Sequence, residues 1–217
     1  MFNTNKMLIE AINSRIEKEY SEDVTVQISD IKLIDKYKDC QSVKNSIDEL
    51  TTILKKYSIE DFKIENILED YLPKLIPPGT KGVIRGNKFN QIIKEKIENM
   101  DLDKEIYSIC FEKKCPVFQT DEIPDWFIMD KENKRALVGM NQLDLWSGGQ
   151  QSNRGSKYIF QNKNTYNFRL ISVVCKKIQL KSKNKTFRLF DKGFNDNTLC
   201  YLNNLQNIIE DFFKLKN

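Results

Sequence analysis

The fold of this chain is most constrained by a stretch in its second half, where two apolar segments flank a polar turn. Residues 126–129 and 135–142 have strand composition, and residues 130–134 between them read Asp-Lys-Glu-Asn-Lys. Two strand-like segments joined by a short polar turn predict an antiparallel hairpin. Any fold proposed for this chain must therefore contain a sheet built around that hairpin.

The sequence on either side of the hairpin extends this sheet. Residues 105–111 and 168–175 also have strand composition, whereas 87–100 and 150–160 have helical periodicity. The expected order is α-β-β-β-α-β, which predicts an α/β core with a mixed sheet flanked by helices. After this core we expect a Lys-rich turn, a short strand near Phe187–Phe190 and a C-terminal helix from about Thr198 to Leu215.

The N-terminal third has a different character. Apolar residues at helical spacing predict helices over residues 6–20, 42–57 and 59–72, with a short strand at Val24–Ile28. Pro77-Pro78-Gly79 is the strongest break in the chain. We therefore expect two parts: an N-terminal helical region, 1–78, that packs on the core, and an α/β core with a C-terminal helix, 79–217.

Composition excludes several classes of chemistry and of location. The chain has no histidine, which rules out Ser-His-Asp and Cys-His catalysis and His-Glu-x-x-His zinc sites. An enzyme of this composition must move protons with carboxylates, lysine, tyrosine or metal-bound water. The five cysteines are odd in number and widely spaced, which favours reduced thiols. With no apolar run that could span a membrane and no secretory signal pattern, we expect a cytoplasmic protein with no membrane partner.

The charge is unevenly distributed along the chain. From Trp146 to the end there are 13 basic and 4 acidic residues, whereas the preceding 145 residues hold 22 basic and 27 acidic ones. A basic half joined to an acidic half favours a polyanionic partner. The alternative is that a Lys-rich composition produces such patches without a binding role.

Polar residues are concentrated around the end of the hairpin. Four of the eight glycines lie between Gly139 and Gly155, and both tryptophans, Trp126 and Trp146, border the same stretch. Amides and glycines lower strand propensity, so packing alone does not account for them. This stretch is where we expect the functional site.

A family resemblance arises from these residues. Pro124-Asp125 opens the first strand of the hairpin, and polar residues end the second strand about 15 positions later. This arrangement, with the α-β-β-β-α-β order over roughly Gly86 to Lys176, resembles the PD-(D/E)XK nucleases, and type II restriction endonucleases most closely. The resemblance implies Mg²⁺ held by two acidic residues, a Lys that orients the attacking water, and hydrolysis of phosphodiester bonds in double-stranded DNA. A divalent metal suits that reaction because it generates hydroxide and neutralises charge on the phosphate.

Asp125 matches the first acid of the family, but the acid-x-Lys pattern is not intact. If Gln142 stands at the Lys position, Met140 stands at that of the acid, and if Asn141 does, Gly139 takes the acid's place. Asp144 is a substitute for the missing acid, because alternate residues of a strand share a side.

The predicted catalytic site is therefore Asp125, Gln142 and Asp144, with Asn141 as a second option, and Asp125 and Asp144 as the metal ligands. A helical carboxylate such as Glu95 would complete the set. For each of these residues an ordinary turn aspartate or a structural hydrogen-bond network is the competing interpretation.

The next stretch has the residue types that contact DNA. Gly148-Gly149 allows close approach of the backbone to a ligand. Glutamine and asparagine pair with adenine edges, arginine pairs with guanine or phosphate, and lysine neutralises phosphate. The predicted DNA-binding residues are Gln150, Gln151, Asn153, Arg154 and Lys157.

Three functions remain open from the sequence. The first is a Mg²⁺-dependent restriction-type endonuclease, expected as a homodimer because both strands of a duplex are cut. The second is a nucleic-acid-binding module on the same fold with a degenerate site. The third is a protein-interaction adapter that uses its acidic helical half.

Overall fold

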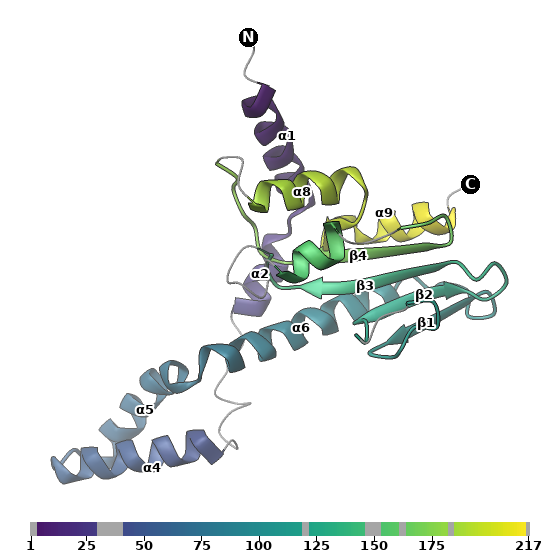
Figure 1. Ribbon diagram of the computed structural model, residues 1–217. Coiled ribbons are helices and arrows are strands. Elements are labelled where there is room, and N and C mark those ends of the chain that lie inside the picture. The colour runs from purple at the N-terminus through teal and green to yellow at the C-terminus, as the bar shows by residue number, and fades with distance from the viewer. Residues whose placement is uncertain are drawn as a thin grey trace. The chain divides into compact units, whose positions relative to one another are not determined.

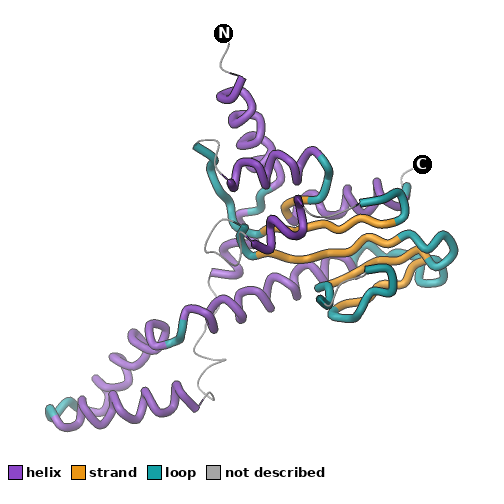
Figure 2. Tube along the Cα trace, in the orientation of Figure 1, coloured by secondary structure: helices purple, strands orange, loops and turns teal. Residues whose placement is uncertain are grey.

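The chain divides into two compact units. The computed structural model describes residues 4–29, 41–118, 122–145, 153–160, 164–181 and 185–215. One unit comprises Met1–Val26 and Phe89–Asn217, and the other comprises Gln27–Lys88. The first unit contains the sheet, and it is discontinuous in sequence because the second unit is inserted into it. Figures 1 and 2 show the elements of both units.

The inserted unit is helical. It contains α4 (Gln41–Lys56), α5 (Asp61–Leu75) and the first half of α6 (Pro78–Glu98), and α4 packs against α5. Pro78 is the first residue of α6, a position that proline favours because the backbone N–H it lacks has no partner there. The Pro-Pro-Gly sequence thus begins a long helix, whose second half, from Phe89, belongs to the sheet unit.

The sheet has five strands, in the order β1-β2-β3-β4-β5. The first three strands pair antiparallel, and β4 and β5 continue the sheet with parallel pairing to β3 and β4. The strands are β1 (Tyr107–Phe111), β2 (Trp126–Asp130), β3 (Ala136–Gln142), β4 (Phe168–Val174) and β5 (Leu199–Tyr201). The predicted hairpin, the α/β class and the mixed sheet are therefore confirmed.

Helices cover both faces of the sheet, as Figure 1 shows. On one face lie the second half of α6 and helix α9 (Leu202–Phe213), where Lys94 of α6 lies over the Phe111 ring and Arg169 of β4 lies over Phe212. On the other face lie the π-helical turn η1 (Ser156–Phe160) and helix α8 (Lys185–Asn195). Burial from both sides explains why β3 and β4 are nearly continuous apolar runs rather than alternating ones.

Two predicted strands are wrong, and the C-terminal helix begins later than predicted. The segment Val24–Ile28 lies in α2 (Glu22–Ser29), because the strand propensity of its β-branched residues is a weak preference that context overrides. Residues 187–190 lie in α8, where Phe187, Phe190 and Phe194 recur at helical spacing and bury one face. Residues 199–201 form β5, and the last helix begins only at Leu202.

Helix α1 (Thr4–Glu19) closes the β5 edge of the sheet. Its last residue, Glu19, is only 6% exposed, and its carboxylate accepts hydrogen bonds from Arg15 Nε (2.7 Å) and from the backbone N–H of Tyr201 (3.3 Å). Arg15 also donates to the carbonyl of Phe194 at 2.8 Å. An edge strand presents unpaired backbone groups, and Glu19 satisfies one of them here.

This arrangement predicts that Glu19→Ala lowers the free energy of unfolding by about 2 kcal/mol, because it leaves a buried backbone N–H without an acceptor. Urea denaturation measures the change. Glu17→Ala is the control on the same helix: Glu17 is exposed and pairs with Lys177, so its loss should cost less than about 1 kcal/mol. Equal effects of the two substitutions would contradict the edge-closing role of Glu19.

Candidate functional site

Asp125 lies directly before β2, where β1 and β3 end. Its backbone N–H donates to the carbonyl of Gly139 (3.1 Å), and its carbonyl accepts from the N–H of Glu112 (3.0 Å). Backbone hydrogen bonds to Gly139 of β3 and to Glu112, the residue after β1, thus fix the backbone of Asp125 at the end of the sheet where these two strands finish. In Figure 1 this end of the sheet is at the arrowhead of β3, beside η1.

The Asp125 carboxylate is held by an amide network. One oxygen accepts from the backbone N–H of Asn141 (2.6 Å) and the other from Asn90 Nδ2 (3.0 Å). Asn141 Nδ2 donates to Asn90 Oδ1 (3.0 Å), and Trp126 Nε1 donates to Asn141 Oδ1 (3.0 Å). The three side-chain donors form one path, from the indole through the two amides to the carboxylate, and the Asn141 backbone N–H reaches the carboxylate directly.

The indole of Trp126 occupies the space above Gly139. A Cβ atom placed on Gly139 would lie 1.9 Å from Trp126 Cε2, and Trp126 itself is 1% exposed. No side chain fits at position 139 while the indole stays there. Of the two sequence registers, the one with Asn141 at the expected Lys position puts Gly139 at the expected acid position, and here the Trp126 indole fills the space over Gly139.

The electrostatics of the site centre on Asp125. Burial raises the pKa of this carboxyl above its ordinary value, against the hydrogen bonds from Asn141 and Asn90. The negative charge of Glu112 raises the pKa further, and the positive charge of Arg154 lowers it. Glu112 and Arg154 are therefore the charged residues that act on the pKa of Asp125.

A second polar cluster lies around Glu122. Its carboxylate accepts from Lys157 Nζ (2.7 Å) and from the Tyr158 hydroxyl (2.5 Å). These two hydrogen bonds lower the pKa of Glu122, although burial opposes the shift. Burial and the Glu122 carboxylate raise the pKa of Tyr158, whereas the charge of Arg154 lowers it. Arg154 therefore acts electrostatically on both Asp125 and this cluster.

The other predicted catalytic residues lie apart from this network. Gln142 is 3% exposed and shares its face of β3 with Met140, the face opposite Asn141. Asp144 follows the end of β3, and Lys176 Nζ lies 3.5 Å from its carboxylate. Glu95 is exposed on α6, where it accepts from Gln91. Asp125 and Asn141 are thus the two predicted catalytic residues that hydrogen bonds join within the described part of the chain.

The predicted DNA-binding residues divide into two groups. Gln150 and Gln151 lie outside the described residues. Asn153 and Arg154 are exposed on the helical turn that leads into η1. Lys157 is exposed as well, but its ammonium pairs with Glu122, so a phosphate would have to compete with that carboxylate.

Sequence reasoning missed Asn90, Glu112 and Glu122. Asn90 lies within a helix, next to the buried Phe89, and a single asparagine among helical residues gives no functional signal. Glu112 has a positive φ of 49°, which places it in a tight turn after β1 that the composition did not reveal. Glu122 precedes the Pro124-Asp125 pair by only two residues, so its nearness to the motif was the one available hint.

The donor set for a metal is small. Across the described residues, no group of three or more Cys, Asp or Glu side chains lies close enough together to hold a metal ion. A Mg²⁺ ion nonetheless needs only one or two carboxylates when a substrate phosphate supplies further oxygens. Asp125 and Glu112 are the carboxylates whose charges interact here.

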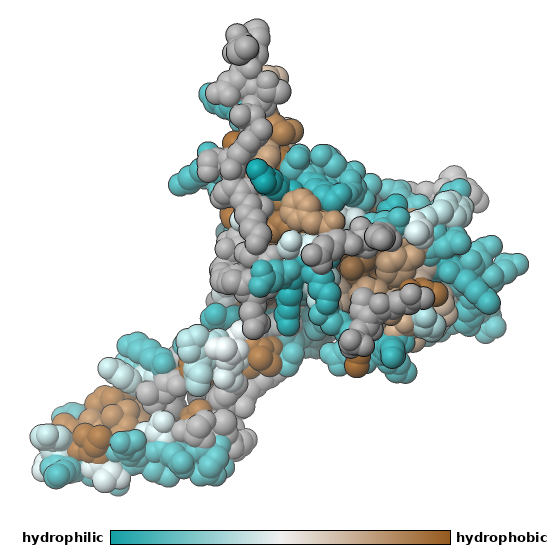
Figure 3. All heavy atoms as spheres, in the orientation of Figure 1, coloured by the Kyte–Doolittle hydropathy of each residue, from teal (hydrophilic) through white to brown (hydrophobic). Residues whose placement is uncertain are grey.

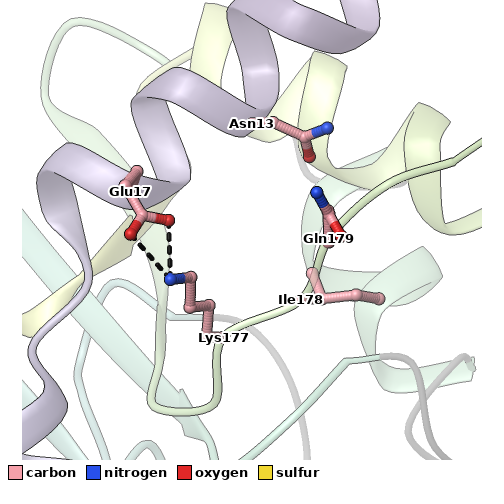
Figure 4. Close-up of a pocket in the computed structure, with 5 residues that line it drawn as sticks. All are labelled: Asn13, Glu17, Lys177, Ile178 and Gln179. Atoms are coloured by element: carbon pink, nitrogen blue, oxygen red, sulfur yellow. Dashed lines mark hydrogen bonds and ion pairs between the residues drawn. The ribbon is translucent and has the colours of Figure 1, made fainter.

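A separate pocket lies between α1 and the segment after β4 (Figure 4). It has a volume of about 410 Å³ and is lined by Asn13, Glu17, Lys177, Ile178 and Gln179. Lys177 pairs with Glu17 across it, and the Asn13 amide makes hydrogen bonds in both directions with the backbone of Leu180. Since these polar groups are committed to one another, the pocket is better explained as packing of α1 than as a reactive site.

The comparisons with known proteins give no relative: no family model, no curated protein and no solved structure matches this chain. No helix in the described ranges is long and apolar enough to cross a membrane.

The raised pKa of Asp125 predicts a pH effect on stability. A carboxyl whose pKa is higher in the folded than in the unfolded state binds protons more tightly when folded, so this group lowers stability as the pH rises above about 3.8. Asp125→Asn cannot ionise. Relative to the wild type, its free energy of unfolding should therefore increase between pH 3.5 and pH 7, about the range over which an aspartate of raised pKa titrates. A difference between the two proteins that does not change with pH would contradict the raised pKa.

Proposed function

We propose that this chain binds double-stranded DNA at the end of the sheet where β3 finishes. It would act as a nucleic-acid-binding module with the layout of a PD-(D/E)XK nuclease. The observation that carries this proposal is the position of Trp126. Its indole fills the space over Gly139, the position where the resemblance calls for the second acid. The α-β-β-β-helix-β order and the pairing of Asp125 with Asn141 support the layout.

The charge around this end of the sheet fits a polyanion. Arg154 and Lys157 are exposed on the turn beside Asp125. An arginine can pair with a guanine edge or a phosphate, and a lysine neutralises phosphate charge. Asn153 adds an amide of the kind that pairs with adenine.

Substitutions of Arg154 and Lys157 test the binding proposal. Arg154→Ala should weaken binding by about 1–3 kcal/mol and relax sequence preference at one position, if its guanidinium pairs with a base. Lys157→Ala should weaken binding of all DNA sequences about equally. It should also reduce the slope of the logarithm of the binding constant against the logarithm of the salt concentration by about one unit. Titrations of duplex DNA at several salt concentrations measure both effects. Arg188→Ala, an exposed arginine of α8, is the control. Unchanged affinity in both site variants would remove this turn from the interface.

The second candidate function is Mg²⁺-dependent cleavage of double-stranded DNA, in the manner of a type II restriction endonuclease. One observation favours it: the Glu112 carboxylate lies close enough to Asp125 to raise its pKa, so two acids stand at the same edge. These two residues would hold the metal, which would supply an activated water and neutralise the phosphate. A homodimer is then expected, because a duplex presents two strands of opposite direction.

Incubation of unmethylated plasmid DNA with and without Mg²⁺ separates the two functions. If the chain is a nuclease, Asp125→Asn and Glu112→Gln should each abolish cleavage while DNA binding stays intact or tightens, because carboxylate–phosphate repulsion is relieved. Glu95→Gln, an exposed glutamate of α6, should cut at the wild-type rate. Salt-sensitive binding without any Mg²⁺-dependent nicking supports the binding module instead. Absence of both binding and cleavage would overturn both proposals.

A further inference from the structure

Two arginines lie close together at the opposite end of the sheet, where β3 and β4 begin. Arg135 precedes β3, Arg169 is the second residue of β4, and both lie on the face covered by α9. Figures 1 and 2 show this end of the sheet beside the C-terminal end of α9. The two arginines are distant along the strands from Asp125 and Asn141, which lie at the other end of the sheet.

Aromatic rings hold the two guanidinium groups. The Arg135 guanidinium lies 4.6 Å from the ring centroid of Tyr166 and 4.6 Å from that of Phe212. The Arg169 guanidinium lies 5.3 Å from the same Phe212 ring. Stacking on ring faces fixes the plane of a guanidinium group.

Among the described residues, few of the guanidinium N–H groups have a hydrogen-bond partner. Each arginine carries five donors. Arg135 uses one, from Nη2 to the carbonyl of Phe212 near the end of α9, and its Nε is buried without a hydrogen bond. Arg169 is partly buried, and its guanidinium forms no hydrogen bond or ion pair with any described residue. Buried donors without acceptors are rare in folded proteins and call for an explanation.

Neither of the two nearby carboxylates forms an ion pair with the arginines among the described residues, although the charge of Arg135 lowers the pKa of Asp130. The Asp130 carboxylate accepts from the backbone N–H groups of Glu132 and Asn133 and from Asn133 Nδ2, which commits it to the β2–β3 turn. Asp211 acts on Arg169 electrostatically without forming an ion pair within the described residues. Lys214 adds a third cation, with its Nζ 6.0 Å from the Tyr166 ring centroid. In Figure 3 this end of the sheet, at the β2–β3 turn, is covered by hydrophilic side chains.

We propose that Arg135 and Arg169 form a binding site for a phosphate monoester. The guanidinium fork of Arg169 matches the oxygens of a phosphate in bidentate geometry. Arg135, whose charge acts on Arg169, adds a second positive charge beside it. Their combined charge also matches a monoester, which carries about −1.5 to −2 at pH 7, better than a carboxylate or a single diester. Tyr166 is 69% exposed, so its ring is accessible for contact with a nucleobase. The ligand is therefore inorganic phosphate or a nucleoside monophosphate.

The test is calorimetric titration of the full chain at pH 7 and fixed ionic strength. The probes are sodium phosphate, adenosine monophosphate, sodium acetate and a single-stranded oligonucleotide without a terminal phosphate. Saturable binding of one or both monoesters, at least tenfold tighter than that of acetate or the oligonucleotide, is expected. Tighter binding of the nucleotide than of phosphate identifies a nucleotide site, and equal affinities identify a site for the phosphate group alone.

Variants locate the site. Arg169→Gln should weaken binding of the monoesters at least tenfold, and because Arg169 makes no hydrogen bond to the described residues, its loss should leave the fold intact. Arg135→Gln removes the second positive charge, so it should also weaken binding. Arg188→Gln on α8 and Asp125→Asn at the other edge should bind as the wild type does, which separates this site from the DNA-binding proposal. Absence of saturable binding of both monoesters, or an Arg169→Gln variant with wild-type affinity, would overturn the site.

Discussion

The packing of the Trp126 indole on Gly139 is the interaction on which the candidate site depends. The ring is 1% exposed and lies over Gly139 of the neighbouring strand, where it takes the place of a side chain on β3. Its one polar atom then needs an acceptor inside the protein, and Asn141 provides it. This fixes the orientation of the Asn141 side-chain amide, which in turn orients the Asn90 amide that donates to Asp125. The backbone N–H of Asn141, which β3 positions, donates to the same carboxylate.

Sheet topology explains why residues distant in sequence gather at that edge. Three antiparallel strands place the end of β1, the start of β2 and the end of β3 side by side, which brings together Glu112, Asp125 and Asn141. Parallel pairing of β4 with β3 places the ends of these two strands together, so Lys176 meets Asp144 at the same edge. The opposite end of the sheet holds the starts of β3 and β4 with the arginine pair. The two ends of the sheet therefore carry different functional side chains.

The sequence predicted the central sheet well because its strands are long, apolar and bounded by polar turns. The hairpin, β1 and β4 were within one or two residues of their predicted limits. Short or context-dependent elements were not predictable: β5 has only three residues, and its stability comes from pairing with β4 rather than from its own composition. Residues of α8 read as a strand because Phe187, Leu189 and Phe190 are crowded together, and the wider helical spacing to Phe194 was overlooked.

The same reasons limit what the sequence revealed of the site. Asp125 and Asn141 were identifiable because the strand order and a short motif place them together. Asn90 was not, since its role depends on how α6 crosses the sheet, and no local pattern encodes that. Likewise, only coordinates could show that the Trp126 indole fills the space over Gly139.

The closure of the β5 edge by α1 also sets an order of events during synthesis. Arg15 and Glu19 leave the ribosome early, whereas their partners Phe194 and Tyr201 are about 180 positions later in the chain. Contacts between such distant segments form late, because the whole intervening chain must be available first. Domains usually fold as units while the chain emerges from its N-terminus. The helical insert, 27–88, is continuous in sequence and complete long before β5 exists, so it is available to fold while α1 still awaits its partners.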